Sequence, residues 1–227
     1  MIEIAGKQVP TTLEEMVDPQ RAALILVDIQ NDYCALGGKR ALDGEDMSLY
    51  SAMIKRIAAL ISAAHQKGVL VIYVQNTNLP DYRSDSAARL RFKLNVRGVK
   101  PEELPRSEYA LEGTWGQQIV DAIAPQSDDL IVKKYRPSAF TDTPLDLLLR
   151  SNDIQTVLIT GVVTEGCVRS TALDASFHDY IVILVEDCIG SSNRRLHAAA
   201  LEVMRAQFDI TTSDQIIRVW CARGETF

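Results

Sequence analysis

Continuous apolar runs alternate along most of this chain with stretches in which apolar residues recur every three or four positions. The runs at 22–28, 69–75, 130–133, 156–160, 181–187 and 210–212 are typical of strands buried on both faces of a sheet. Helical spacing between them predicts helices at 46–67, 144–150, 165–177 and 194–207, and a short one at 115–123. This alternation predicts an α/β fold: a doubly wound (Rossmann-like), six-stranded, mostly parallel sheet with helices on both faces.

Two segments fall outside the alternation. Residues 1–20 are mixed and contain proline, and we interpret them as an N-terminal arm. Residues 76–114 are rich in Asn, Asp, Arg, Gly and Pro and have no clear periodicity. We interpret them as an insertion that caps the site, because long loops in compact domains are usually functional or disordered. The 227 residues are expected to form a single domain, 1–227.

Composition excludes some functions. The formal net charge is −6 and the Lys and Arg residues are scattered, so we expect no nucleic-acid partner. The apolar runs are too short to span a bilayer and the first ten residues do not resemble a secretion signal, so we expect a cytoplasmic protein without a membrane partner. The four cysteines lie far apart, which indicates neither a disulfide framework nor a zinc site.

Polar residues at the ends of strands are the first candidates for chemistry, because ligands bind beyond the carboxyl ends of parallel strands. Asp28 ends the first run; its segment fits a general base and a turn cap equally well. Lys133 and Lys134 end a later run, and strand geometry directs them to opposite faces. Taken alone, this segment is more simply explained by two solvated lysines.

Cys167 follows the strand at 156–160 and lies in the first turn of the next predicted helix. A helix N-terminus stabilises a thiolate and can receive a developing oxyanion, although a buried structural cysteine is the alternative. His65, His178 and His197 lie in or just after predicted helices rather than at carboxyl-edge loops. A Cys–His dyad and a catalytic metal are therefore disfavoured, and Asp28 is the candidate base by position.

Together these segments resemble the isochorismatase-like cysteine hydrolase family. The resemblance covers about residues 20 to 212 and rests on Leu24-Ile-Leu-Val-Asp28-Ile-Gln-Asn-Asp32, Lys134-Tyr-Arg-Pro-Ser138-Ala-Phe140 with Thr143 and Leu145, Gly161-Val-Val-Thr164-Glu-Gly-Cys167-Val with Thr171 and Ala172, and Val185-Glu-Asp187. It implies a doubly wound fold and a catalytic triad of Asp28, Lys134 and Cys167. It also implies a cis peptide bond between Val162 and Val163, with the backbone N–H groups of Val163 and Cys167 forming an oxyanion hole.

The resemblance further implies hydrolysis through a thioester, without metal or cofactor. Asp28 would take the thiol proton of Cys167 in the positive field of Lys134, and the thiolate would attack the substrate carbonyl. Asp28 would then protonate the leaving amine and activate the water that hydrolyses the thioester. Family members are often dimers or tetramers, so a homodimer or homotetramer is expected.

The family contains hydrolases of isochorismate, nicotinamide, N-carbamoylsarcosine, ureidoacrylate, biuret and triuret. Nicotinamidases resemble each other in an Asp–His–His metal site after the second strand, but residues 75–82 contain no histidine. Biuret-type enzymes are similar in Asp28–Cys34, in Gly37-Gly38 and in Glu186-Asp187-Cys188. Pro137, however, stands where those enzymes have a second substrate-facing lysine. Triuret, ureidoacrylate and carbamoyl amino acids therefore remain open beside biuret.

We therefore expect a metal-independent cysteine amidohydrolase that cleaves a C–N bond of a small ureido or carbamoyl compound. Four residues are candidates for substrate binding, each with a structural or solvent-facing alternative: Gln207, by resemblance to a biuret-type glutamine, and Arg136, Asn76 and Tyr82, by their positions in loops. Isochorismatase-type or nicotinamidase-type hydrolysis is the alternative reaction. A ligand-binding protein on the same fold is the alternative without catalysis.

Overall fold

The computed structural model describes residues 1–222, except for the side chains of 105–107, and its centre is one six-stranded sheet. The strands are β3 (Ala22–Val27), β4 (Leu70–Asn76), β5 (Leu130–Lys134), β6 (Thr156–Val162), β7 (Ile181–Gly190) and β8 (Asp209–Thr211). Their order is β5-β4-β3-β6-β7-β8, and every neighbouring pair is parallel. The doubly wound α/β prediction is confirmed.

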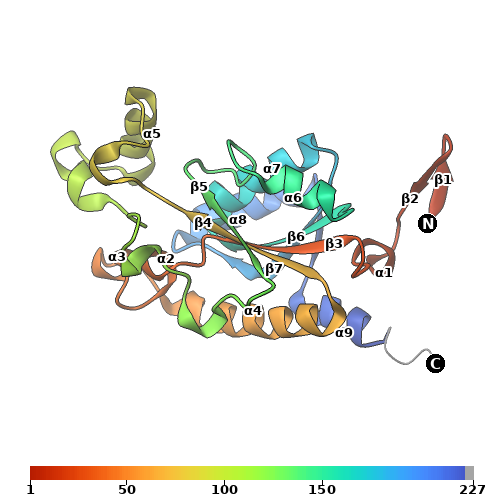
Figure 1. Ribbon diagram of the computed structural model, residues 1–227. Helices are drawn as coiled ribbons and strands as arrows, with labels where there is room; N and C mark the ends of the chain where they lie inside the picture. The colour runs from red at the N-terminus through yellow and green to blue at the C-terminus, as the bar shows by residue number, and fades with distance from the viewer. Residues whose placement is uncertain (223–227) are drawn as a thin grey trace.

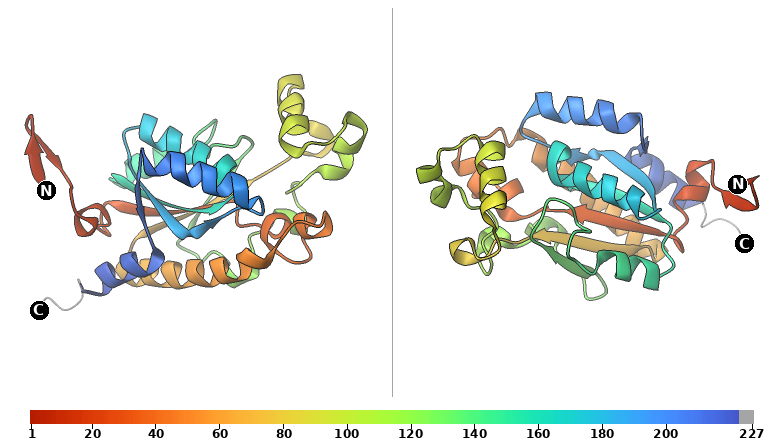
Figure 2. Two further views of the ribbon diagram at one scale, coloured as in Figure 1. Left: turned by 180° about the vertical axis from the view of Figure 1, so that it is seen from behind. Right: turned by 90° about the horizontal axis from the view of Figure 1, so that it is seen from above.

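Helices cover both faces of this sheet (Figures 1 and 2). One face packs against α4 (Ser48–Lys67) and α9 (Ser213–Ala222), and the other against α6 (Leu145–Ser151), α7 (Arg169–Phe177) and α8 (Arg194–Arg205). All six residues of β3 are buried, which explains the continuous apolar run there. Within residues 1–222, no helix has both the length and the apolar character needed to cross a bilayer.

Helix α9 was not anticipated by the sequence pattern. Ile216 and Trp220, one helical turn apart, are buried in the core beside α4. The Trp220 indole N–H donates to the Val17 carbonyl at 2.8 Å, which ties α9 to the segment after α1 (Leu13–Met16). The N-terminal arm also has structure of its own, with a hairpin of β1 (Ile2–Ile4) and β2 (Lys7–Val9) that projects from the amino edge in Figure 1.

The segment 76–114 is more ordered than its composition suggested. It contains η1 (Pro80–Tyr82), α5 (Ala87–Arg97) and η2 (Pro101–Ser107), and it stands beyond the carboxyl edge of the sheet in Figure 1. Helix α5 escaped detection because it buries Lys93 while Phe92 and Val96 are exposed. The helix predicted at 115–123 is wrong: two short 3-10 turns, η3 (Trp115–Gln117) and η4 (Asp121–Ile123), flank a bridge between Gln30 and Ile119.

The strand order creates a switch point between β3 and β6. From β3 the chain passes through α2 (Asn31–Cys34), α3 (Lys39–Leu42) and α4 to β4 and β5 on one side, then crosses to β6 on the other. The loops that leave β3 and β6 therefore diverge at the carboxyl edge and open a crevice there, which is where doubly wound sheets bind ligands. Asp28 and the turn that contains Cys167 both lie at this point.

Candidate active site

Asp28 is the first residue after β3, and its backbone turns sharply there. Its φ angle is 55°, a left-handed value that Asp tolerates better than most residues. The Asp28 N–H still continues the sheet by donating to the Val74 carbonyl at 2.9 Å, and Oδ1 accepts from the Asn76 N–H at 3.0 Å. The residue is buried, and burial raises its pKa above 3.8 although Lys134 acts in the opposite direction.

Lys134 is the last residue of β5, and strand alternation decides which of the two lysines faces the site. Lys133 is exposed and pairs with Glu112 at 3.0 Å, whereas Lys134 is completely buried. The Lys134 Nζ lies 2.7 Å from Asp28 Oδ2 and donates to Cys167 Sγ at 3.3 Å and to the Arg136 carbonyl at 3.2 Å. All three ammonium protons thus have acceptors. Burial opposes the charge, but Asp28 and Cys167 raise the pKa of Lys134 above 10.5.

Cys167 lies in a tight turn between β6 and α7. The turn η5 (Thr164–Val168) is a π-helix, and the Val163 carbonyl at its start accepts from the N–H groups of Gly166 at 3.0 Å and Val168 at 3.2 Å. The peptide bond between Val162 and Val163 is cis, as the family resemblance implied. The helix predicted from 165 is therefore a π turn first and an α-helix only from Arg169.

Gly161 explains how this turn approaches Asp28. It pairs with Val27 in the sheet and has a φ angle of 114°. A Cβ atom at this position would lie 2.0 Å from the Val27 carbonyl oxygen, a distance that no side chain can occupy. Glycine is therefore required for the end of β6 to lie against the end of β3, which brings the cysteine turn next to Asp28.

The protonation of the site follows from its burial. Cys167 is only partly buried, whereas Asp28 and Lys134 are buried. Burial raises the pKa of Cys167 to about 12, Lys134 lowers it, and Asp28, which is hydrogen-bonded to the thiol, raises it. The resting group at neutral pH is therefore a thiol whose proton faces a buried carboxylate, with a lysine ammonium beside both. This arrangement can pass a proton from sulfur to oxygen and stabilise the resulting thiolate.

Gln30 and Tyr33, which the sequence analysis did not choose, hold the rim of the site through Asn76. Gln30 is completely buried: its Nε2 donates to the carbonyls of Asn76 at 2.8 Å and Gln117 at 2.6 Å, and its Oε1 accepts from the Asn76 N–H at 2.9 Å. Asn76 in turn donates from Nδ2 to the Tyr33 hydroxyl at 2.6 Å. Gln30 and Tyr33 follow an apolar strand and are polar, which was the available signal, but the sequence analysis chose only Asp28 from the residues after β3.

The four predicted substrate ligands have different fates. Asn76 lies at the site, as just described, and Arg136 lies beside Lys134. Arg136 contacts Lys134 through its carbonyl, and its guanidinium donates to the carbonyls of Ser84 at 3.0 Å and Tyr135 at 2.7 Å. Tyr82 lies against α5, with its ring centroid 5.5 Å from Lys93 Nζ.

Gln207 is not brought to the triad. It is exposed and lies between α8 and β8, where the chain prepares to re-enter the sheet. The β8 residue Asp209 pairs with Ile183 early in β7, whereas Val162 of β6 pairs with Gly190 at the end of β7. Gln207 is therefore at the amino edge of the sheet, opposite the edge that carries Asp28 and Cys167. The position of Gln207 at the end of a helix, just before a strand, did not reveal at which edge of the sheet it would lie.

One histidine lies closer to the site than expected. His197 Nδ1 is 2.7 Å from the Thr164 hydroxyl, because α8 packs beside the π turn. Burial lowers the pKa of His197, although Glu165 raises it, so the imidazole favours its neutral form. The Cys167 sulfur itself contacts Asp28 and Lys134. Within the part of the chain that the structure describes, no three His, Cys, Asp or Glu residues come together as a metal-binding group.

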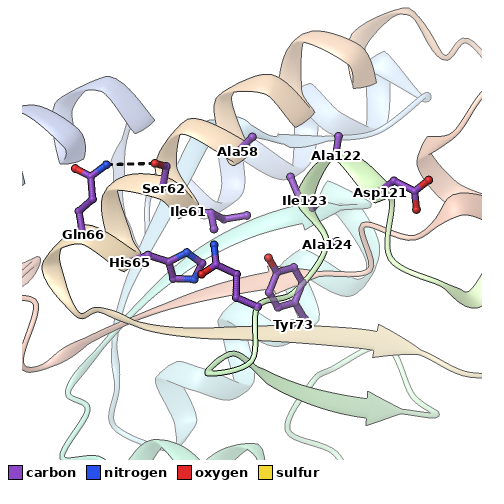
Figure 3. A pocket seen from close by; sticks show the side chains of 11 residues that line it. Ala58, Ile61, Ser62, His65, Gln66, Tyr73, Asp121, Ala122, Ile123 and Ala124 are labelled. Atoms are coloured by element: carbon purple, nitrogen blue, oxygen red, sulfur yellow. Dashed lines mark hydrogen bonds between the residues drawn. The ribbon is translucent and has the colours of Figure 1, made fainter.

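A separate cavity of about 390 Å³ lies away from the triad, on the α4 face of the sheet (Figure 3). Residues of α4 and β4 line it together with the segment from Asp121 to Gln126, and the side chains of His65 and Tyr73 point into it. Since none of the triad residues lines this cavity, it does not belong to the crevice at the switch point.

Comparison with known proteins adds independent findings. The isochorismatase domain family matches residues 22–215. A cysteine hydrolase from Pseudomonas syringae pv. phaseolicola 1448A is 25% identical with a TM-score of 0.76, covering 91% of this chain and 95% of that one. A pyrazinamidase of Pyrococcus horikoshii in complex with zinc is 27% identical (TM-score 0.65; coverage 85% and 99%). N-carbamoylsarcosine amidase from Thermoplasma acidophilum shares the fold at 24% identity (TM-score 0.65; coverage 86% and 97%).

Proposed function

Because the chain belongs to the isochorismatase domain family, we propose that it is a metal-independent cysteine amidohydrolase that cleaves a C–N bond of a small ureido or carbamoyl compound. One observation carries this proposal: the Lys134 ammonium lies 2.7 Å from the Asp28 carboxylate and 3.3 Å from the Cys167 sulfur, in a buried group at the switch point of the sheet. A nucleophile, a base and a fixed cation within hydrogen-bonding distance are what acyl transfer through a thioester needs.

The first half of the reaction uses the raised pKa of Asp28. Asp28 removes the thiol proton from Cys167, and the sulfur attacks the substrate carbonyl carbon to form a tetrahedral oxyanion. Lys134 already donates to the sulfur and stabilises the negative charge that arises there. When the C–N bond breaks, Asp28 returns the proton to the leaving nitrogen, which leaves as ammonia or an amine, and an acyl thioester remains on Cys167.

The second half regenerates the thiol. Asp28, now ionised again, removes a proton from a water molecule as that water attacks the thioester carbonyl. The C–S bond breaks, the carboxylic or carbamic acid product leaves, and the proton held by Asp28 returns to the sulfur. Each proton thus passes through Asp28.

The oxyanion hole is assigned to the backbone N–H groups of Val163 and Cys167. The Val163 carbonyl already accepts from Gly166 and Val168, so both of its lone pairs are occupied. This carbonyl therefore does not take the Cys167 N–H, and we propose that this N–H, in the first turn of the helix, donates to the substrate oxygen. Val163 follows the last residue of β6, at the carboxyl edge of the sheet where Asp28 and the cysteine turn lie, which supports the proposal for its N–H group.

Biuret, triuret, ureidoacrylate and N-carbamoyl amino acids are the substrates proposed, and a carbamoyl substrate agrees with the likeness to N-carbamoylsarcosine amidase. Isochorismatase-type and nicotinamidase-type hydrolysis are the alternatives. The chain segment 75–82 after β4 has no histidine, which disfavours the Asp–His–His metal site of the nicotinamidase branch. Ligand binding without catalysis is disfavoured by the buried ion pair, because burying a charged pair beside a thiol costs stability that binding alone does not require.

The test is ammonia release from biuret, triuret, ureidoacrylate, N-carbamoylsarcosine and nicotinamide, with Cys167→Ala measured beside the wild type. Release from a ureido compound that disappears in the variant supports the proposal. Activity that survives in Cys167→Ala rules out the thioester mechanism. Hydrolysis of isochorismate in place of every amide, identified by its products, moves the chain to the ether-cleaving branch.

We also propose that the segment 76–114 caps the site, that the protein acts in the cytoplasm without nucleic-acid or membrane partners, and that it forms a homodimer or homotetramer. The capping role is supported by the stacking of Tyr109, from this segment, on Tyr33 beside the triad. Light scattering coupled to size-exclusion chromatography measures the oligomeric state, and a monomer at micromolar concentration contradicts this part of the proposal.

A further inference from the structure

Helix α5 presents three cations inward and leaves two of its large apolar residues exposed. Arg89, Lys93 and Arg97 recur every fourth residue and so share one face of the helix. Lys93 on this face is 4% exposed, whereas Phe92 and Val96, which border the face, are 45% and 68% exposed. The Arg89 guanidinium lies over the Phe92 ring, 4.7 Å from its centroid, at the border between the cationic face and the exposed apolar residues. A surface helix normally buries its apolar stripe, so this inversion needs a cause in the surroundings of the cationic face.

Part of the cationic face is neutralised within the cap itself. Lys93 pairs with the buried Asp85 and donates to Asn78 Oδ1 at 2.8 Å, so its charge is accounted for. Burial raises the pKa of Glu108, a second carboxyl in the group, which favours its uncharged form although Lys93 and Arg97 oppose this. The local carboxylates therefore compensate Lys93 more fully than Arg89.

Arg89 lacks a hydrogen-bond partner for its Nε atom. Its Nε lies 3.8 Å from Asp85 Oδ1, too far for a hydrogen bond, and this Nε is buried with no hydrogen-bond partner in the described structure. Burial lowers the pKa of Arg89, Asp85 and Cys167 raise it, and Arg136 and Arg97 lower it. Contacts join this part of the cap to the triad: Asp85, the ion-pair partner of Arg89, follows Ser84, whose carbonyl accepts from the Arg136 guanidinium, and the Arg136 carbonyl accepts from Lys134.

Contacts also connect the cationic face to the triad along a second path. The Arg97 guanidinium lies 5.0 Å from the Tyr109 ring centroid, and Tyr109 stacks on Tyr33 at 5.7 Å. The Tyr33 hydroxyl accepts from Asn76, whose backbone N–H donates to the Asp28 carboxylate. The stacked rings of Tyr109 and Tyr33 lie between Arg97 and the base Asp28 and restrict movement, so the cationic face has a fixed position relative to the reacting atoms.

We propose that the cationic face of α5, with Arg89 as the principal residue and Arg136 beside it, binds a carboxylate on the substrate. The protein then prefers ureido or carbamoyl compounds that carry a carboxylate over neutral ones such as biuret. A guanidinium fork matches a carboxylate with two parallel hydrogen bonds, which is the pairing that an unsatisfied buried Arg N–H requires. This inference rests on the proposed function and narrows its substrate class.

The experiment compares two ureas of similar shape, N-carbamoylglycine with a carboxylate and isobutylurea without one, together with biuret. Arg89→Gln removes the charge from the inward face, and Arg91→Gln removes the same charge from an exposed position of the same helix as the matched control. In Arg89→Gln, KM for N-carbamoylglycine is expected to rise about 10- to 100-fold with kcat nearly unchanged, since a charge-assisted hydrogen bond is lost. Values for the neutral compounds stay as in the wild type, and Arg91→Gln behaves as wild type throughout.

Binding to the Cys167→Ala protein, measured by calorimetry, keeps the inference testable without turnover. N-carbamoylglycine is expected to bind more tightly than isobutylurea, and Arg89→Gln in that background removes the difference. Equal binding of the two ureas, or an equal loss for both in Arg89→Gln, overturns the inference, even if neutral ureas prove to be substrates and the proposed function holds. Selective binding of the carboxylate without ammonia release from any compound supports the anion site and overturns the hydrolytic function.

Discussion

Replacing Lys134 with methionine tests the electrostatic account of the site most directly. Methionine has nearly the same length and packs in an apolar setting, so the change removes the charge with little loss of volume. Lys134 and Asp28 are both buried, with 2.7 Å between Nζ and Oδ2. Coulomb's law at this separation, with an effective dielectric constant of about 20, gives an attraction of about 6 kcal/mol.

The measured loss is smaller than this attraction, because desolvation offsets part of it in the wild type. Breaking a buried pair by removing one partner costs about 3–5 kcal/mol, since the other charge stays buried without compensation. We therefore expect Lys134→Met to lower the free energy of unfolding by about 3–5 kcal/mol at pH 8. Asp28→Asn combined with Lys134→Met removes both charges and is expected to recover most of this loss.

The loss depends on pH in a direction that the pKa shifts determine. In Lys134→Met the largest influence that opposes burial at Asp28 is gone, and only the hydrogen bonds from Cys167 and Asn76 still lower its pKa. The raised folded-state pKa therefore makes the variant most stable below pH 3.8 and less stable as pH rises. In the wild type, the raised pKa of Lys134 keeps the contribution of the pair intact up to pH 10.5. The difference between the two proteins is therefore small near pH 4 to 5 and complete at pH 8.

Urea unfolding at pH 5 and pH 8 of the wild type, both single variants and the double variant measures these differences in a double-mutant cycle. Equal stability of wild type and Lys134→Met at pH 8, or strict additivity of the two single changes, would refute the claim that the buried pair is coupled. A stability gap that shrinks as pH rises would refute the assigned direction of the Asp28 shift.

Three further predictions follow from single contacts. Burial raises the pKa of Cys167 to about 12, so iodoacetamide at pH 7 should label Cys167 more slowly than the exposed Cys221, as measured by peptide mass spectrometry. Rapid labelling of Cys167 at mildly acidic pH would contradict a resting thiol. Gly161→Ala should cost more than about 3 kcal/mol in thermal unfolding or prevent folding, because its Cβ meets the Val27 oxygen. The control Gly44→Ala, which has open space around it and a φ of 83°, should cost about 1–2 kcal/mol, and equal costs would exclude the close approach at Gly161. Gln30→Leu removes the side-chain donor to the Asn76 carbonyl and leaves the Gln117 carbonyl with Gln75 alone, so it should cost about 2–4 kcal/mol in urea unfolding. A neutral effect would show that this bridge does not hold the rim.

The strand pattern alone was sufficient for the sheet and for placing Asp28 and Cys167 at strand ends. Strands buried on both faces leave apolar runs such as 22–28, and a polar residue that ends such a run must lie at the carboxyl edge. Asp28 and Cys167 were therefore placed correctly by their distance from a strand end. The choice between Lys133 and Lys134 came from the family resemblance, and the alternation of burial in β5 agrees with it.

Only the tertiary structure decided the rest, and each case has a local reason. Gln207 lies at the amino edge because β8 pairs with the start of β7, a register that the sequence of α8 does not encode. His197 reaches the cysteine turn because α8 packs on it, and helix packing is a contact between distant segments. Helix α5 has no apolar stripe facing the domain, so the periodicity that identifies a helix was missing.

The sequence determined which residues follow which strands, because hydrophobic burial and strand alternation act over a few neighbouring positions. The three-dimensional structure determined which of those residues meet. Asp28 lies beside Cys167 because the switch point falls between β3 and β6 and because Gly161 lets these two strands approach closely. Lys134 reaches Asp28 across the end of β4 because the lysine side chain is long. The proposed role of a charged residue such as Arg89 also depends on the tertiary structure, because the electrostatic energy of a cation is set by the groups around it in space rather than by its neighbours in the chain.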